Sequence, residues 1–430
     1  MDHGLHLQDQ NKLKTEVSEK ESIADPAVQL QQSGSLCKHR IVVAKSLEDI
    51  EKIRGDWQYL EDKFGRNAPF SNYIFFQQLC HTFDEKTKPH VIVVYDDAEP
   101  IALLIGRQTV CPVFCLKAIG LEILSMRCWT IFFDGIITND KASSIDAAID
   151  YFDCQLKSGG IDILNLQHIP LNDKAAMKIV HYLQDRFKSI LKPEFHLYRE
   201  LRDAETGLEN CTNSSKTMST FRRKDRKLTT YFGGSLEMQM LSSICDLQPF
   251  IEDAASIVSQ TYQSALGTGV TNDQHWQTIT QALASIGSFR GYLLKSNNIL
   301  ISYVLGAVVN DRFTLFATGF LPKYQKFSPG TVLMNRVLTS LTEEGVNVVD
   351  LGFGDASYKR LHATQIEEDL SIQVYGKGFL SSLEWTFISC TSITLRIAKH
   401  TLRKLGLKRI TKRIWRQHLL RRSMRSLSTQ

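Results

Sequence analysis

The side chains best suited to chemistry lie together in the second half of the chain, in VVDLGFGDASYKRLHA, residues 348–363. A β-rich run ends at Asp350, a Gly-Phe-Gly loop follows, and Asp355, Tyr358 and Lys359 come next. A carboxylate can accept a proton, a phenol can donate one and an amine can bind an anion. The lone GxG comes after a crossover instead of opening one, so it is not a dinucleotide fingerprint. A surface turn with solvated side chains explains the same residues without any site.

An anion site is predicted just before this loop, in KYQKFSPGTVLMNRVL, residues 323–338. Ser328 is a favourable N-cap and Pro329 suits the first position of a helix. The apolar residues that follow recur at helical spacing, so we expect a helix to begin here. The N-terminus of a helix favours an anion, Lys326 adds positive charge, and Gly330 lets a ligand approach the backbone. A well-capped helix that binds nothing is the alternative.

These two stretches belong to a predicted strand–helix–strand crossover. Residues 312–319 and 346–351 are the strands, and in such a unit the helix N-terminus and the loop after the second strand meet at one edge of the sheet. The elements before the crossover repeat in both halves, because helices are followed by a β-hairpin at 91–107 and again at 291–309. We therefore predict a duplicated α/β domain. The other elements predicted are a strand and a helix within 41–62, helices near 71–83, 143–157 and 172–187, strands at 161–167 and 196–201, and helices at 217–232, 247–265 and 272–285.

Composition places the chain among globular proteins without a disulfide framework. It has 430 residues, 43% hydrophobic and 9% aromatic, which is enough for the cores of two domains. Nine cysteines are scattered without a CxxC pair, and no two histidines have metal spacing, which argues against a zinc site and for a reducing compartment. Lone histidines such as His168 and His275 are expected to be packed or surface residues. No uncharged apolar run approaches the roughly 20 residues of a membrane span.

The two ends of the chain differ from the rest. Residues 1–38 are polar, lack the apolar segment of a signal peptide and are expected to form a disordered leader. No acidic residue follows Glu384, whereas residues 396–425 contain 12 Lys or Arg. The other 39 basic residues face 46 acidic ones, so the basicity belongs to this tail. An amphipathic helix around 407–421 can lie on an anionic membrane surface, pack on the body or, least favoured, bind nucleic acid such as tRNA.

The order FATGFLPKYQKFSPGTVL followed by EEGVNVVDLGFGDASYK resembles the second domain of a bacterial GNAT-fold acyltransferase family, the one named after cellulose-biosynthesis acetyltransferases. STFRRKDRKL upstream resembles the basic helix that opens this domain. The resemblance covers residues 215–375, and residues 41–200 resemble the first half of the related peptidoglycan-bridge aminoacyltransferases. It implies an α/β (α+β) fold of tandem GNAT-like domains, each a mixed central sheet flanked by helices. The predicted units are the leader 1–38, the domains 39–202 and 203–380, and the basic tail 381–430.

The resemblance also implies the reaction, which is transfer of an acetyl or other acyl group from acyl-coenzyme A to an amine or hydroxyl, in cell-envelope or polysaccharide metabolism. The pantetheine arm would lie along 312–319. The pyrophosphate would bind the loop through Gln325, Lys326, Ser328, Gly330 and Thr331. This loop departs from the family's Arg/Gln-x-x-Gly-x-Gly/Ala pattern, because Ser328 and Pro329 take two of its places and proline has no N–H to donate. No metal is expected.

An amine held near a thioester can react without a covalent intermediate, provided that a base, an oxyanion site and an acid are at hand. Tyr358 is predicted to be the acid for the leaving thiolate. Asp350 or Asp355 is predicted to orient or deprotonate the acceptor. Lys359 is predicted to bind an anionic acceptor or a phosphate.

The basic helix at 217–232 has two interpretations. Arg222 and Arg223 can bind an acidic or phosphate-bearing acceptor or a nucleic acid, or they belong to a solvated face. Two other functions stay open: an aminoacyl-tRNA-dependent transferase, for whose long helical arm the sequence has no obvious room, and a catalytically silent binding module. The acceptor can be a glycan, a lipid precursor, a peptide or a small amine. The protein is expected in the cytoplasm, with peripheral binding to the inner face of the membrane through 396–425.

Overall fold

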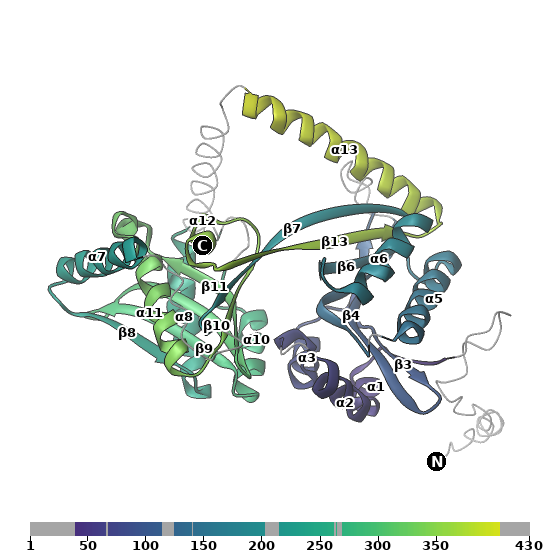
Figure 1. The fold of residues 1–430 in the computed structure, drawn as a ribbon, viewed down its shortest axis with the longest axis horizontal. Helices are drawn as coiled ribbons and strands as arrows, with labels where there is room; N and C mark the ends of the chain where they lie inside the picture. Colours follow the sequence, from purple (N-terminus) through teal and green to yellow (C-terminus); the bar gives the residue numbers. More distant parts are fainter. Residues whose placement is uncertain are drawn as a thin grey trace, which may run out of the picture.

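The computed structural model describes residues 39–65, 68–113, 124–139, 141–202, 215–261, 264 and 269–404 (Figure 1). The first half contains β1 (Arg40–Ala44), α1 (Leu47–Lys52), α2 (Arg54–Phe64), η2 (Pro69–Ser71), α3 (Tyr73–Cys80), β2 (Thr87–Pro89), β3 (Val91–Asp96), β4 (Glu99–Pro112), β5 (Ser125–Thr138), α5 (Ala142–Ser158), β6 (Ile163–Pro170), α6 (Lys174–Arg186) and β7 (Lys188–Glu200). The second contains α7 (Ser215–Tyr231), β8 (Leu236–Leu241), η3 (Ile244–Asp246), α8 (Leu247–Ser259), α10 (Gln274–Ser285), β9 (Phe289–Ser296), β10 (Ile299–Val309), β11 (Arg312–Phe320), η4 (Pro322–Phe327), α11 (Pro329–Glu343), β12 (Val348–Phe353), α12 (Ser357–His362), β13 (Gln365–Tyr375) and α13 (Phe379–Lys404).

The described strands join into one thirteen-stranded sheet. Their order is β1-β3-β4-β5-β6-β13-β7-β12-β11-β10-β9-β8, with β2 beside β4. β3 and β4 form the hairpin predicted at 91–107, and β9 and β10 form the one predicted at 291–309. Their turns use Asp97 and Asn297–Asn298 at positive φ, a conformation that Asp and Asn tolerate better than most residues.

The centre of the sheet is built by an exchange of strands between the halves. β7 follows α6 of the first half but pairs with β12 of the second, and β13 follows α12 of the second half but pairs with β6 of the first. β7 and β13 also pair with each other, from Gln365 opposite Tyr198 to Tyr375 opposite Lys188. Figure 1 shows these two long strands running side by side from one lobe into the other. Each half therefore completes its sheet with a strand of the other.

Each half also contains one parallel pair of strands that separates after a few residues. β5 pairs with β6 only from Cys128 to Ile131, and β11 pairs with β12 only from Arg312 to Thr314. In both halves the adjacent antiparallel pair has a register shift, between Leu104 and Gly106 where β4 pairs with β5 and between Leu305 and Gly306 where β10 pairs with β11. The strands then diverge, which leaves a gap within the sheet of each half.

Helix α3 packs between the two lobes. Its neighbour Trp57 in α2 is fully buried and donates its indole N–H to the carbonyl of Ser71 over 2.9 Å. Phe75 and Leu79 on α3 instead belong to the buried core of the second half, against α10. Phe70 lies just before α3. Its ring centroid is 6.2 Å from that of Phe132 in β5 and 5.9 Å from that of Phe316 in β11. Elements far apart in the sequence therefore share one core.

The predicted fold class is confirmed: a mixed sheet flanked by helices, in two related halves. The strand expected at 196–201 is confirmed as the end of β7, but β7 begins earlier, at Lys188, because the exposed lysines and Pro193 in its first part hide its β pattern. β13 was not predicted. The domain boundaries stay a prediction, since β7 ends near the expected boundary yet pairs with strands of both halves.

The described part of the chain ends with α13, which starts on the sheet and then extends away from the body (Figure 1). Trp385 donates its indole N–H to the Ser189 carbonyl (3.3 Å), and Lys188 lies over its ring. No helix among the described residues is long and apolar enough to cross a bilayer. The leader 1–38 and the tail from residue 405 lie outside the described residues, so their predicted behaviour stays a prediction.

Candidate functional site

The gap between β11 and β12 holds the predicted residue Lys359. Beyond Asp350, β12 carries one extra residue and passes through Gly352 at φ +76°, so that it bulges away from its neighbours. Lys359 Nζ donates to the carbonyl oxygen of Phe353 over 2.8 Å. A Cβ at Gly352 would lie 3.4 Å from this Nζ and 3.9 Å from the Leu315 carbonyl oxygen of β11. The ammonium thus lies at the mouth of the gap. Burial lowers the pKa of Lys359, and the Asp350 carboxylate opposes this shift.

The predicted anion site lies at the start of α11, with one correction. Ser328 occupies the N-cap position, but its backbone is left-handed (φ 56°, ψ 53°) and its side chain makes no capping hydrogen bond. The chain must turn there between η4 and α11, and a residue before proline is disfavoured in the right-handed helical conformation. The Ser328 carbonyl instead accepts from the N–H groups of Thr331 (3.0 Å) and Val332 (3.2 Å). The Gln325 carbonyl accepts from Ser328 N–H (3.0 Å).

Basic and aromatic side chains surround this turn. Lys326 Nζ lies 5.0 Å from the ring centroid of Phe327 and 5.7 Å from that of Tyr231 in α7. Lys227, also in α7, lies 5.6 Å from the Phe327 ring. Gly330 is open enough that an added Cβ would only touch the Phe320 ring at 3.3 Å. The structure therefore brings cations of α7 and η4 together at the N-terminus of α11.

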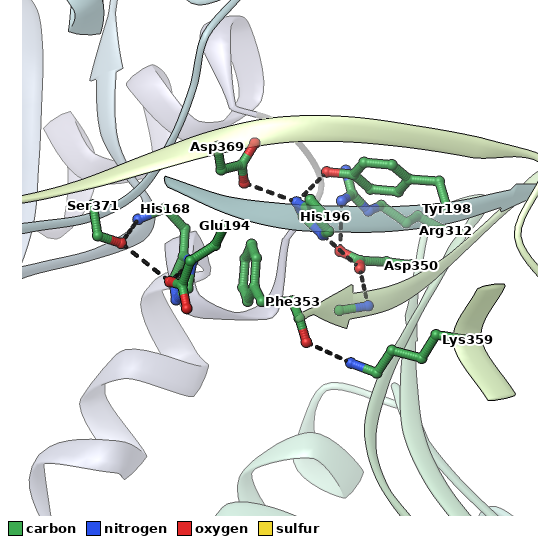
Figure 2. A network of polar contacts seen from close by, with 11 residues as sticks. His168, Glu194, His196, Tyr198, Arg312, Asp350, Phe353, Lys359, Asp369 and Ser371 are labelled. Carbon is green, nitrogen blue, oxygen red and sulfur yellow. Dashed lines mark hydrogen bonds and ion pairs between the residues drawn. The ribbon is translucent and has the colours of Figure 1, made fainter. Parts of the chain in front are cut away.

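A buried polar network joins the two halves beneath these elements (Figure 2). Asp350, 2% exposed, accepts from His196 Nε2 and from the N–H of Gly352 at 2.7 Å each, and from an Arg312 guanidinium nitrogen at 2.7 Å. His196 Nδ1 faces Asp369 Oδ2 at 3.0 Å and the Tyr198 hydroxyl at 2.6 Å. The imidazole is thus held between carboxylates from β12 and β13.

The electrostatics of this network follow from its burial and pairing. Burial alone would lower the pKa of His196, but the two carboxylates outweigh it and raise that pKa. Burial alone would raise the pKa of Asp350, yet His196 and Arg312 outweigh it and lower that pKa. Asp350 is therefore an ionised, fully engaged carboxylate. Such a group is suited to orienting its neighbours and is a weak proton acceptor.

Beside this network, β6 carries a bulge that presents His168. Gln167 and His168 together lie opposite Ser371 of β13, and the N–H of His168 donates to the Ser371 hydroxyl over 3.0 Å. His168 Nδ1 lies 3.3 Å from Glu194 Oε2 of β7. Figure 2 shows its ring stacked on the Phe353 ring, with Lys359 reaching the Phe353 carbonyl from the other side.

A cleft of about 410 Å³ opens where the halves meet. Carboxylates from three strands line it: Asp134 of β5, Glu200 of β7 and Glu367 of β13. Tyr198 and Arg312 also contribute, but the Arg312 charge is paired with Asp350, so the lining is acidic. The remaining lining includes Phe133, Pro170 and Val348.

The other predicted residues are more exposed. Tyr358 in α12 is 39% exposed, and Asp355 forms an ion pair with Arg360. Arg222 and Arg223 are exposed on α7, away from the buried network. The structure thus gathers Lys359, Asp350 and Tyr358 around β12 and α12, and it places the five predicted phosphate-binding residues together in one turn.

Sequence reasoning missed the partners of Asp350. His196 and Asp350 are 154 positions apart, and no local pattern pairs such residues. A weaker signal was present, because His196, Tyr198 and Glu200 alternate along one strand and so predict a polar face. The expectation that His168 is only a packed or surface residue overlooked its bulge. That bulge is visible only in the register with which β6 pairs with β13.

Comparison with known proteins adds a domain assignment. Residues 215–360 match the model of the acetyltransferase (GNAT) domain. This match covers a third of the chain, so the second half contains a GNAT acetyltransferase domain. At the level of sequence, no curated protein matches. The broader recognition as a GNAT protein is confirmed, whereas the narrower resemblance to cellulose-biosynthesis acetyltransferases stays a prediction.

Solved structures resemble the whole arrangement. FemX superposes with a TM-score of 0.51 at 11% identity, over 74% of this chain and 95% of FemX. L-PGS from Bacillus licheniformis gives 0.47 at 11% identity, over 80% of this chain and 96% of that one. A tandem GNAT protein from the clavulanic acid biosynthesis pathway gives 0.43 at 9% identity, over 78% and 98%. At such low identity the likeness to FemX shows the fold alone.

Proposed function

We propose that this protein transfers an acyl group from acyl-coenzyme A to an amine. The observation that carries the proposal is the gap between β11 and β12, inside a GNAT domain, with the basic N-terminus of α11 on one side of it. Strands that separate expose backbone groups to an extended thioester arm. The helix N-terminus and Lys326 supply the positive potential that a pyrophosphate needs.

The acidic cleft supports an amine as the acceptor. Three carboxylates line it, and carboxylates attract an ammonium group while they repel an anionic acceptor. In the reaction the amine nitrogen bonds to the acyl carbon, the carbon–sulfur bond breaks, and sulfur leaves with the electron pair. Tyr358 is the proposed donor of the proton that this thiolate takes. The proposed role of Lys359, whose ammonium donates to the Phe353 carbonyl, is to stabilise developing negative charge.

Donor binding is the first test. Acetyl-coenzyme A at 100 times its Kd should stabilise the folded protein by about 2.7 kcal/mol, because it binds only the folded state. Thermal unfolding with and without acetyl-coenzyme A measures this as a rise in the midpoint. Lys326→Glu removes a cation from the turn and Gly330→Trp fills it, so the rise should be lost in both. Lys174→Glu, exposed on α6, makes the same charge change elsewhere and should keep the rise.

The mechanism has its own test. Tyr358→Phe should lower the release of free thiol with little change in the midpoint rise. Unchanged turnover would remove Tyr358 from the mechanism. A saturating concentration of acetyl-coenzyme A that raises no midpoint would overturn the proposed donor.

A second donor fits the same basic surface. Arg222 and Arg223 are exposed on α7, whose Lys227 lies beside the predicted phosphate turn. These basic residues of α7 are more than a pyrophosphate requires, and they also suit the phosphates of an aminoacyl-tRNA. Stabilisation by RNA, with no response to acetyl-coenzyme A, would favour this donor. Stabilisation by acetyl-coenzyme A without turnover on any acceptor would favour a silent binding module.

The cellular setting belongs to the same proposal. A role in cell-envelope or polysaccharide metabolism and peripheral binding to the inner face of the membrane through 396–425 rest on the sequence. Vesicles of anionic lipid that sediment the full chain, but not a chain that ends at residue 404, would support the membrane contact.

A further inference from the structure

The bulges of β6 and β12 share their register shift and a left-handed residue, and they differ in what occupies that left-handed position. Each strand has just left its parallel partner, each gains one extra residue, and each passes through a left-handed backbone conformation. In β12 the left-handed residue is Gly352 (φ +76°); in β6 it is His168 (φ +53°). Left-handed positions favour glycine because they crowd a Cβ. The second half has the residue that this backbone prefers, and the first half has a histidine.

A strained backbone at a non-glycine residue is a recognised feature of functional sites, and bulges there direct a side chain to a specific place. The bulge is held by the Ser371 hydroxyl, which accepts from the His168 N–H over 3.0 Å. A glycine would keep this main-chain hydrogen bond. The side chain of His168 is therefore the feature that distinguishes this bulge from the one in β12.

Contacts fix the orientation of this imidazole. Nδ1 lies 3.3 Å from Glu194 Oε2, and Glu194 is itself held by Lys192 Nζ at 2.7 Å. The ring stacks on Phe353. This contact is an ion-pair distance and not a formed hydrogen bond. The negative charge of Glu194 favours the proton on Nδ1, which leaves Nε2 as the acceptor. The side chain keeps 21% of its surface exposed, so the ring is not sealed in the core.

The position of His168 links the two parts of the candidate site. The Phe353 ring on which it stacks belongs to the residue whose carbonyl holds Lys359 at the gap. Its other aromatic neighbour, Phe133, has its ring 6.4 Å away and lines the acidic cleft. The imidazole therefore contacts one aromatic residue that lines the cleft proposed for the acceptor and one whose carbonyl holds Lys359 at the gap proposed for the donor.

We propose that His168, oriented by Glu194, is the general base of acyl transfer. This inference rests on the proposed function. It names a general base, a role that the two predicted carboxylates do not fill, because Asp350 is fully engaged and Asp355 is paired with Arg360. His168 Nε2 takes the proton that the acceptor amine loses as its nitrogen bonds to the acyl carbon. The carbon–sulfur bond breaks, and the thiolate is protonated by Tyr358. The imidazolium then returns its proton to solvent.

The surroundings of His168 determine when it can act. Burial lowers its pKa, Glu194 and Asp369 raise it, and His196 and Lys192 lower it, with a net lowering. The imidazole is then neutral, as a base must be, over most of the neutral range. Activity should rise with pH through the pKa of His168. Replacing Glu194 with Gln removes a charge that raises this pKa, so the rise in activity should move to lower pH.

The experiment measures thiol release from acetyl-coenzyme A with glucosamine, lysine and spermidine as acceptors, alongside the donor-induced rise in unfolding midpoint. His168→Gln should lower kcat by about 10²–10⁴-fold, abolish the acidic limb of the pH profile and keep the midpoint rise. His168→Gly should fold at least as well as His168→Gln, because glycine suits the backbone. Free imidazole should restore part of the rate of His168→Gly and none of the rate of His168→Gln. His181→Gln, exposed on α6, is the control and should match the wild type.

The remaining outcomes show whether the inference about His168 or the proposed function is wrong. Thiol release by His168→Gln at the wild-type rate, with the acidic limb retained, overturns this inference and leaves the proposed function standing. Loss of activity in His168→Gly without rescue by imidazole, together with loss of the midpoint rise, assigns His168 a packing role and also overturns it. Donor binding by the wild type without thiol release on any of the amines overturns amine transfer itself, and this inference with it.

Discussion

Replacing Asp350 with Asn tests whether the buried network holds the two halves together. The carboxylate accepts hydrogen bonds from His196, Arg312 and the N–H of Gly352, each at 2.7 Å, and it is 2% exposed. An amide has nearly the same shape and can keep the hydrogen bond to Gly352. It removes the charge that stabilises the other two groups, and it replaces the oxygen that accepts from Arg312 with an amide NH2.

The magnitude follows from the burial of the partners. Removing one member of a buried ion pair costs about 3–5 kcal/mol, because the other charge is left without compensation. The Arg312 side chain keeps 18% of its surface exposed and therefore some hydration. We expect the lower end, about 3 kcal/mol. With an unfolding entropy of about 2.1 cal/mol/K per residue, the Tm of the 430-residue chain should fall by about 3 °C.

Differential scanning calorimetry at neutral pH provides the measurement. Asp146→Asn is the matched control, because Asp146 pairs with Lys178 over 2.7 Å on the exposed surface of α5 and α6. An exposed pair contributes at most about 1 kcal/mol. If Asp350→Asn melts with the control and the wild type, the network does not carry charge–charge stabilisation and the pairing argument is wrong.

Three further predictions concern packing and pH. Gly306→Ala should lower the free energy of unfolding by about 1–3 kcal/mol, because its Cβ would lie 2.6 Å from the Thr314 carbonyl oxygen. Gly55→Ala is the control and should not lower it, because an added Cβ there would have nothing within 4 Å. Equal urea midpoints for the two variants would contradict the prediction. Because the pKa of His196 is raised in the folded state, its contribution to stability should be complete below about pH 6.5 and lost as the pH rises through the folded pKa, and His196→Gln should flatten the urea midpoint over that window. Phe75→Ala should cost about 3–5 kcal/mol by calorimetry, unless α3 does not seal the core of the second half.

Much of the fold could be predicted because its elements are encoded locally. Hairpin turns with Asp or Asn, the Ser-Pro start of α11 and the apolar spacing of its helix all lie within short windows. The predicted phosphate turn also lies within one such window, so its residues are together in the structure. Only the predicted capping role of the Ser328 side chain was wrong. Whether this side chain caps α11 depends on the direction in which η4 leads the chain into the helix.

The rest depended on pairings between distant segments. The first part of β7 carries lysines and Pro193 and looks like a loop until β13 pairs with it. The side-chain partners of Asp350 come from β7 and β11, and the orientation of His168 depends on a one-residue mismatch with β13. A local pattern contains none of this information, because register is a property of two strands.

The exchange of β7 and β13 also has a consequence for the order in which the protein is made. While a ribosome extends the chain, β6 and β7 are complete long before residue 365 has been synthesised, yet their partner is β13. Until then both strands have an unpaired edge, which is the kind of surface that joins other chains. Closing the sheet requires contacts across nearly 200 positions, such as Leu370 with Ile169, and such closures are slow. The sheet of the first half therefore stays incompletely paired until β13 has been synthesised. During this interval the nascent chain is most exposed to aggregation.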